Sequence, residues 1–370
     1  MSQISRTLLV SAAAMSLALT AAACGKAGSS SSSSSASGSV AASSLSGKVG
    51  LLLPENQTTR YEKFDKPFFE AKMKELAPSV TVDYANAAGS AATQAQQVTT
   101  MINAGVKVLV VDPVDAAAIK ASVVAASTKG IKVVSYDRLS QGPADAYVSF
   151  DNIKVGQLQG QGLLNVLGSK ATPTAKVVEI DGDSADPNAA DFKSGFQGVV
   201  KGKVDLAYDA SGLWKADVAA QKAAAAINQL GAGNIAAFYS ANDGMAAGIA
   251  TSMKNAGISN LPLTGQDAQL DAIQRIMVGT QSFTIYKAYQ PEADAAAQLA
   301  VDLMSGNSIS SLATTTKTNG SGNKVPSDLL TPVLVKADNV KDTVVKDGLY
   351  TVAQICTSAY AAGCKANGLS

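Results

Sequence analysis

The sequence predicts an α/β protein whose parallel sheets are flanked by helices. Three observations predict this class. Short runs rich in β-branched residues alternate along the chain with Ala-rich segments of helical length. The runs are apolar throughout, as is typical of strands buried on both faces. The chain has 370 residues, of which 46% are hydrophobic, and this length suits two lobes with a core each.

The predicted elements follow the chain in order. The runs expected to form strands are residues 49–53, 108–111, 132–136, 176–180, 235–239, 261–264 and 283–286, with a further strand-like run at 204–208. The segments expected to form helices are residues 67–76, 93–104, 116–129, 154–167, 191–200, 216–230, 244–256, 270–278 and 291–304. Local signals agree, since Asp65 can cap a helix with Pro67 in its first turn. Glycines typical of helix C-termini stand at Gly105, Gly130 and Gly231.

The composition excludes several classes of function. A formal charge of +1 does not provide the basic surface that nucleic-acid binding requires, so no nucleic-acid partner is expected. The chain has no histidine, which excludes His bases, Ser-His or Cys-His nucleophiles and His metal ligands. Three cysteines are too few for a zinc-finger array. Neither a metal nor a cofactor is expected.

The first residues read as an export signal. An apolar run after Arg6 spans residues 8–23 and ends in small residues before Cys24, like a bacterial lipoprotein signal. We expect residues 1–23 to be cleaved and Cys24 to be lipidated, and the alternative is ordinary cleavage that leaves Cys24 as a free thiol. Residues 24–46 are rich in Ser, Gly and Ala, as is typical of a flexible tether. This predicts an exported chain anchored by lipid to the outer face of the cytoplasmic membrane.

Polar and aromatic side chains follow several predicted strands, some directly and some after a loop, at the end of the sheet where open α/β folds bind ligands. Such residues are Arg60, Tyr61, Asp137, Arg138, Asn188, Trp214, Asn242, Asp243, Gln266, Asp267 and Lys287. Planar groups that donate or accept hydrogen bonds suit sugar hydroxyls, and aromatic rings suit the C–H faces of a pyranose. An Asp after a strand is also a common helix cap, so for Asp243 and Asp267 a structural role is an open alternative. The coincidence of so many polar residues at equivalent positions favours a sugar site.

The chain resembles the periplasmic sugar-binding proteins of ABC importers, and among them the D-xylose-binding family. The resemblance runs from residue 48 to about residue 346. The stretches that carry it are residues 101–105, 134–138, 149–156, 240–243, 264–267, 279–281, 286–287, 330–332 and 342–344.

The resemblance implies two Rossmann-like lobes joined by three hinge crossings, the type I periplasmic binding protein fold. It places residues 47–150 and about 288–330 in an N-terminal lobe, and residues 151–287 and about 331–370 in a C-terminal lobe. It implies a monosaccharide between the lobes, D-xylose or a related aldose, a permease partner in the membrane and a monomeric receptor without catalytic activity. The ligand contacts that it implies are Arg60, Asp137, Arg138, Asn188, Trp214, Asn242, Asp267 and Lys287. Tyr61 stands where xylose-binding relatives have Trp, a departure that bears on the identity of the sugar.

Three further interpretations stay open. A glycosidase would use Asp137 and Asp267 as its carboxylate pair, although basic neighbours oppose the raised pKa that one of them needs. A sugar-sensing module for a membrane receptor would share the fold and the site and differ in its partner. Cys356 and Cys364 form either a disulfide or two buried thiols, and export favours the disulfide.

Overall fold

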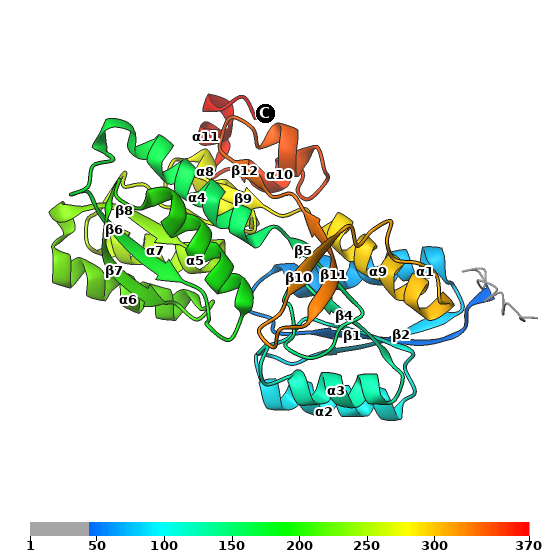
Figure 1. Ribbon diagram of the computed structural model, residues 1–370. Helices are drawn as coiled ribbons and strands as arrows, with labels where there is room; N and C mark the ends of the chain where they lie inside the picture. Colours follow the sequence, from blue (N-terminus) through cyan, green and yellow to red (C-terminus); the bar gives the residue numbers. More distant parts are fainter. Residues whose placement is uncertain (1–43, 370) are drawn as a thin grey trace, which may run out of the picture. The chain divides into compact units, whose positions relative to one another are not determined.

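The structure is a computed structural model that describes residues 44–369 (Figure 1). Cys24, the predicted signal segment and all but the last residues of the predicted tether lie outside the described residues. The parallel α/β architecture predicted from the alternation of apolar runs is confirmed in two separate sheets.

The first sheet has seven strands in the order β10-β11-β5-β4-β3-β1-β2. All neighbours pair in parallel except β10, which is antiparallel to β11. The strands are β1 (Gly47–Leu53), β2 (Val80–Asn86), β3 (Val108–Val111), β4 (Lys132–Tyr136), β5 (Ala146–Phe150), β10 (Thr315–Thr318) and β11 (Lys324–Leu330). Helices α1 (Lys66–Leu76) and α9 (Tyr289–Ser305) cover one face, and α2 (Ala91–Asn103) and α3 (Lys120–Thr128) cover the other (Figure 1).

The second sheet has three parallel strands in the order β7-β6-β8. Its strands are β6 (Lys176–Asp181), β7 (Asp205–Ser211) and β8 (Ile235–Ser240), and its helices are α4 (Asn152–Leu167), α5 (Pro187–Val200), α6 (Ala216–Leu230) and α7 (Asp243–Asn255). They share one apolar core. Helices α4 and α5 approach closely at Gly156, where a Cβ atom would lie 2.0 Å from the carbonyl oxygen of Phe192. Glycine is therefore needed there to bring α5 to its place.

The remaining elements surround a small third sheet. Strands β9 (Thr284–Tyr286) and β12 (Val333–Val335) pair antiparallel, beside α8 (Leu270–Met277), α10 (Val352–Ile355) and α11 (Ala361–Ala366). Single π-helical turns occur at Tyr61–Asp65 and Lys341–Val345, and 3₁₀ turns at Gly168–Lys170 and Ala232–Asn234. Within residues 44–369, each helix is too short or too polar to cross a lipid bilayer.

Three sequence predictions about local structure were wrong. Residues 261–264 form only one bridge, between Leu263 and Phe238, because the Thr264 hydroxyl takes the backbone hydrogen bonds of Ser240 that a longer strand would form. Residues 283–286 contribute an antiparallel strand, not a parallel one. Asp65 precedes α1, but its side chain makes no capping hydrogen bond and pairs with Arg60 instead. That pairing takes Asp65 into the site described below.

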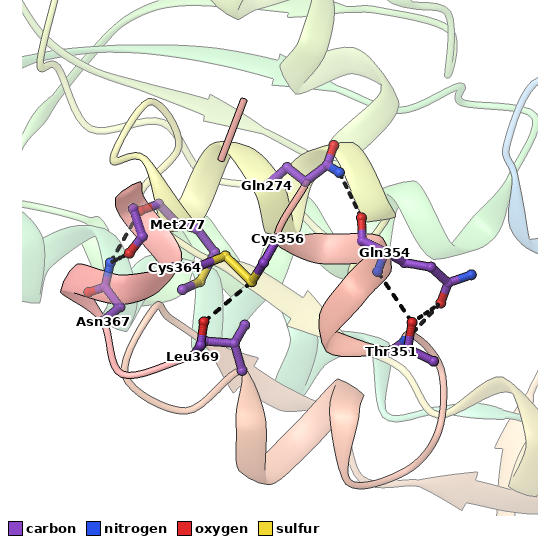
Figure 2. Close-up of a disulfide and its surroundings, with 9 residues drawn as sticks. Gln274, Met277, Thr351, Gln354, Cys356, Cys364, Asn367 and Leu369 are labelled. Atoms are coloured by element: carbon purple, nitrogen blue, oxygen red, sulfur yellow. Dashed lines mark hydrogen bonds between the residues drawn. A yellow bond between two sulfur atoms is a disulfide. The ribbon is translucent and has the colours of Figure 1, made fainter. Parts of the chain in front are cut away.

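Cys356 and Cys364 form a disulfide that closes the C-terminal segment into a loop against α8 (Figure 2). Cys364 is buried in an apolar cluster with Met277. Side-chain amides fasten both sides of the loop, since Asn367 Nδ2 lies 3.1 Å from Met277 O and Gln274 Nε2 lies 3.0 Å from Gln354 O. The loop therefore ties the end of the chain to α8.

Removal of this disulfide should destabilise the fold. We expect the double substitution Cys356→Ser and Cys364→Ser to lower the free energy of unfolding by about 2 to 3 kcal/mol, because the unfolded chain regains the entropy of a short loop. Urea denaturation with and without a reductant measures this change. The reductant should lower the midpoint of the wild-type chain and leave that of the double variant unchanged. Equal midpoints for both oxidised chains would contradict the prediction.

Candidate functional site

A small pocket, with a cavity volume of about 20 Å³, lies beside the carboxyl ends of the strands. Each ligand contact that the resemblance implies lines it, as does Tyr61, whereas Asp243 does not. The lining residues are Thr58, Arg60, Tyr61, Asp137, Arg138, Asp186, Asn188, Phe192, Trp214, Asn242, Gln266, Asp267 and Lys287. Arg60 and Tyr61 follow β1, Asp137 and Arg138 follow β4, and Lys287 follows β9. Others follow β6, β7 and β8, so both larger sheets supply walls of one pocket.

Arg60 contacts three carboxylates, more than either of the other cations that line the pocket. Its Nε lies 2.8 Å from Asp65 Oδ2, its Nη2 lies 2.5 Å from Glu292 Oε2 and its Nη1 lies 3.2 Å from Asp137 Oδ1. The π-helical turn that starts after Arg60 carries Asp65 back toward the guanidinium. Arg60 is 2% exposed, so this cluster of charges is removed from water. The arginine therefore fixes the position of Asp137 at the pocket wall.

Arg138 joins carboxylates from the two larger sheets. Its Nε lies 2.9 Å from Asp186 Oδ2, before α5, and 3.5 Å from Asp112 Oδ1, after β3. Its Nη2 donates to the Tyr61 hydroxyl at 3.1 Å. Neither carboxylate oxygen of Asp112 has a hydrogen-bond partner among the described residues. Arg138 is thus the nearest countercharge of a carboxyl group that is completely buried.

Lys287 completes the set of pocket cations. Its Nζ lies 3.1 Å from Asp267 Oδ1 and within 6 Å of the ring centres of Phe150 and Phe192, at 5.9 and 5.7 Å. Like Arg60 and Arg138, it is therefore paired with a carboxylate of the protein. No cation that lines the described pocket is left unpaired for a phosphate or carboxylate ligand, and the site favours a neutral molecule.

Burial and neighbouring charges shift the pKa values of the pocket carboxyl groups in opposite directions. Burial would raise the pKa of Asp137, but Arg60, Lys287 and Arg138 together hold it below its ordinary value. Burial raises the pKa of Asp186 to about 6 and that of Glu292 to about 8. Asp137 is therefore an ionised hydrogen-bond acceptor. Its lowered pKa argues against the interpretation of Asp137 as the general acid of a glycosidase.

The raised pKa of Glu292 predicts a stability that falls as the pH rises. The folded-state pKa is about 8 and the ordinary value is 4.5, so between these values the folded chain holds a proton that the unfolded chain releases. This contribution is complete below pH 4.5 and is lost toward pH 8. We expect the free energy of unfolding to fall across this range, and Glu292→Gln to remove at least about 1 kcal/mol of that fall. Denaturation at pH 5 and pH 8 measures both, and parallel losses in the two chains would contradict the prediction.

Strained backbone marks the same residues. Asp137, Trp214 and Asp267 have φ angles of 52°, 59° and 96°, and they are among few non-glycine residues with positive φ in residues 44–369. Each such residue costs about 1 to 3 kcal/mol and persists where its surroundings hold it. The carbonyl oxygen of Asp137 accepts hydrogen bonds from Tyr147 and Ser149. Such strain clusters at ligand sites, and it is independent of the strand-end argument.

Trp214 and Gln266 offer unused hydrogen-bonding groups to the pocket. Trp214 Nε1 and Gln266 Oε1 are buried and have no partner among the described residues. The indole packs against Phe192, with ring centres 6.3 Å apart, and over Gly182, where a Cβ atom would lie 2.0 Å from the ring. One free donor and one free acceptor match a hydroxyl, which does both.

The sequence prediction missed several residues of the site. Thr58, Asp186 and Phe192 line the pocket, and Asp65, Asp112 and Glu292 support its cations. Asp112 directly follows β3, so the strand-end rule applied to every strand finds it. Glu292 lies within α9 and gives no local signal. The structural alternative holds for Asp243, whose carboxylate accepts hydrogen bonds from Gln269 N–H, Gln281 and Thr284 and does not line the pocket. Asn242 lines the pocket, and its Oδ1 also caps α7 by accepting from Met245 N–H.

Comparisons with known proteins agree with this geometry. Residues 49–308 match the family model described as a periplasmic binding protein domain. A D-xylose-binding periplasmic protein of Escherichia coli is 36% identical over 325 residues, which cover 85% of this chain and 94% of that protein. A protein of the same description from Haemophilus influenzae is 34% identical over the same shares. A solute-binding protein of Clostridium phytofermentans, crystallised with β-D-glucose, superposes with a TM-score of 0.76 at 27% identity, covering 83% of this chain and 99% of that chain.

The fold and the family match define a non-enzymatic transport receptor. The chain belongs to the periplasmic binding protein family, among the sugar-binding proteins of ABC transporters. Proteins of this family work outside the cytoplasm as transport receptors. The prediction that the chain is not an enzyme is thereby confirmed, and the interpretation as a glycosidase is wrong.

Proposed function

We propose that the chain captures D-xylose, or a closely related aldose, and delivers it to the membrane permease of an ABC transporter. The observation that carries this proposal is the pocket itself, in which paired cations exclude an anion while Trp214 and Gln266 keep a free donor and a free acceptor. The D-xylose-binding relatives support xylose. Two solved neighbours that hold glucose, from Clostridium phytofermentans and Chloroflexus aurantiacus, make glucose the main competitor.

The proposed mechanism is closure of two lobes on the sugar. The lobes are residues 47–150 with about 288–330, and residues 151–287 with about 331–370, and they hinge near residues 150, 287 and 331. Support comes from the strands, because β10 and β11 belong to the first sheet whereas β9 and β12 lie apart from it. A sugar that contacts both walls favours the closed form, and the permease recognises that form. We further propose that lipidated Cys24 tethers this monomeric receptor to the membrane, which fractionation of cells tests.

Substitution of Trp214 tests the site directly. We expect Trp214→Ala to weaken sugar binding by about 1 to 3 kcal/mol, because the sugar loses a stacking surface, and to leave the unfolding midpoint nearly unchanged since the ring is only partly buried. Calorimetric titration with D-xylose, D-glucose, D-galactose, D-ribose and L-arabinose measures affinity and preference. Trp214 is the only tryptophan, so intrinsic fluorescence of the wild-type chain reports the same event. Equal affinities for Trp214→Ala and the wild-type chain would contradict the site, and no binding to any sugar would contradict the function.

A further inference from the structure

A contact outside the pocket joins the first sheet to α5. Lys317 Nζ, on β10, lies 3.0 Å from Asp191 Oδ2, in the second turn of α5, and the two side chains are 31% and 32% exposed. Neither residue lines the sugar pocket. We call this ion pair the α5 latch. It connects elements that the proposed function assigns to different lobes.

The hairpin that carries Lys317 is firmly attached to the first sheet. Strand β11 pairs in parallel with β5. At the tip, the buried side chain of Asn319 donates from Nδ2 to Ser140 O at 2.9 Å and to Gly142 O at 3.0 Å. These carbonyls belong to the loop that follows Asp137 and Arg138. These contacts therefore fix the position of the backbone that carries the Lys317 ammonium group.

Asp191, the other partner of the latch, lies on a helix that also contacts the sugar pocket. Asn188 precedes Asp191 by three residues in α5, and residues at this spacing lie on the same side of a helix. Asn188 lines the pocket, and its Nδ2 donates to Asp137 O at 3.0 Å. Just before α5, Ala116 N–H donates to Ala185 O at 3.1 Å. Several contacts thus hold the start of α5 against the first sheet, and the latch is one of them.

We propose that Lys317 and Asp191 form an affinity-determining ion pair that stabilises the closed form without touching the sugar. This inference rests on the proposed function, in which closure brings the two sides together. Because the latch contacts no ligand atom, it contributes the same factor to the affinity for every sugar. It forms after the sugar has entered, so it slows dissociation and leaves association nearly unchanged.

The experiment compares three single substitutions by stopped-flow fluorescence and calorimetry with the sugar panel. Lys317→Met and Asp191→Asn should each weaken binding by about two- to fivefold, the range for a partly exposed ion pair. The loss should appear in the dissociation rate, be equal for all bound sugars and shrink at high salt. The matched control is Lys324→Met, because Lys324 lies on the same hairpin, is exposed and forms no ion pair among the described residues. The control should bind like the wild-type chain.

The double variant shows whether Lys317 and Asp191 act through their mutual ion pair or affect sugar binding independently. Lys317→Met combined with Asp191→Asn should lose no more affinity than either single variant, because each removes the same interaction. Additive losses, a loss that differs between sugars, or an equal loss in Lys324→Met would overturn the latch. If the wild-type chain binds no sugar, the proposed function fails. The unfolding midpoints of the two single variants and the double variant then provide the test. A double variant that is no less stable than either single variant supports the ion pair, and additive losses of stability overturn it.

Discussion

Replacement of Arg138 by alanine should weaken sugar binding by about a hundredfold or more. The guanidinium lies 2.9 Å from Asp186 and 3.5 Å from Asp112, which come from the two sides of the pocket. Loss of one partner of a buried charge pair costs about 2 to 5 kcal/mol, much of it from the charge left behind. Asp112 has no hydrogen-bond partner among the described residues, so its carboxyl group loses its nearest countercharge. The substitution also removes donors from the pocket wall.

Calorimetric titration measures this loss, with circular dichroism to show that the chain stays folded. Arg138→Lys is the matched variant, because it keeps the charge and loses the planar fork that reaches both carboxylates. We expect it to recover part of the affinity. An affinity of Arg138→Ala within threefold of the wild-type value would show that Arg138 is no part of the ligand site.

Replacement of Arg60 by methionine should be the most destabilising of these changes. Arg60 contacts Asp65, Asp137 and Glu292, and its guanidinium also lies over the Tyr289 ring, 4.7 Å from its centre. Methionine keeps much of the apolar volume but leaves the carboxyl groups without their shared cation. Breaking a buried ion pair in this way costs about 3 to 5 kcal/mol. Sugar binding should fall as well, because Asp137 loses a group that positions it.

Urea denaturation measures the free energy of unfolding, with Lys74→Met as the control. Lys74 is exposed on α1 and forms no ion pair in the described part of the chain, so its substitution should change stability by less than about 0.5 kcal/mol. A loss of similar size in both variants would show that the charge cluster around Arg60 does not stabilise the fold.

The comparison of prediction and structure is clearest at the strands. Strands β1, β3, β4, β6 and β8 were predicted because each is a run of buried apolar residues. Strand β2 was missed, since it lies at an edge of the first sheet and most of its side chains are partly exposed. Strand β10 is also an edge strand, and its side chains are mostly exposed. A polar edge strand lacks the apolar run on which the prediction depends.

The predicted ligand contacts all line the pocket for a related reason. The carboxyl ends of parallel strands meet at one edge, so Asp137, Arg138 and Lys287 reach the site by following their strands. Their binding roles remain predictions until sugar titrations are made. The positive φ angles of Asp137 and Asp267 had no signal in the sequence, because they are imposed by contacts with distant residues.

The sequence alone determined three features of this protein. They are the alternation of strands and helices, the residues suited to sugar binding after several strands, and the short spacing of Cys356 and Cys364. Each can be predicted because it depends on residues that are close together in the chain. Only the tertiary structure decided which charges share a partner. Arg60 and Glu292 are 232 residues apart, and Lys317 and Asp191 are 126 apart. Such pairs form because folding removes both groups from water together, and no local pattern records which of the chain's carboxylates will lie beside a given cation.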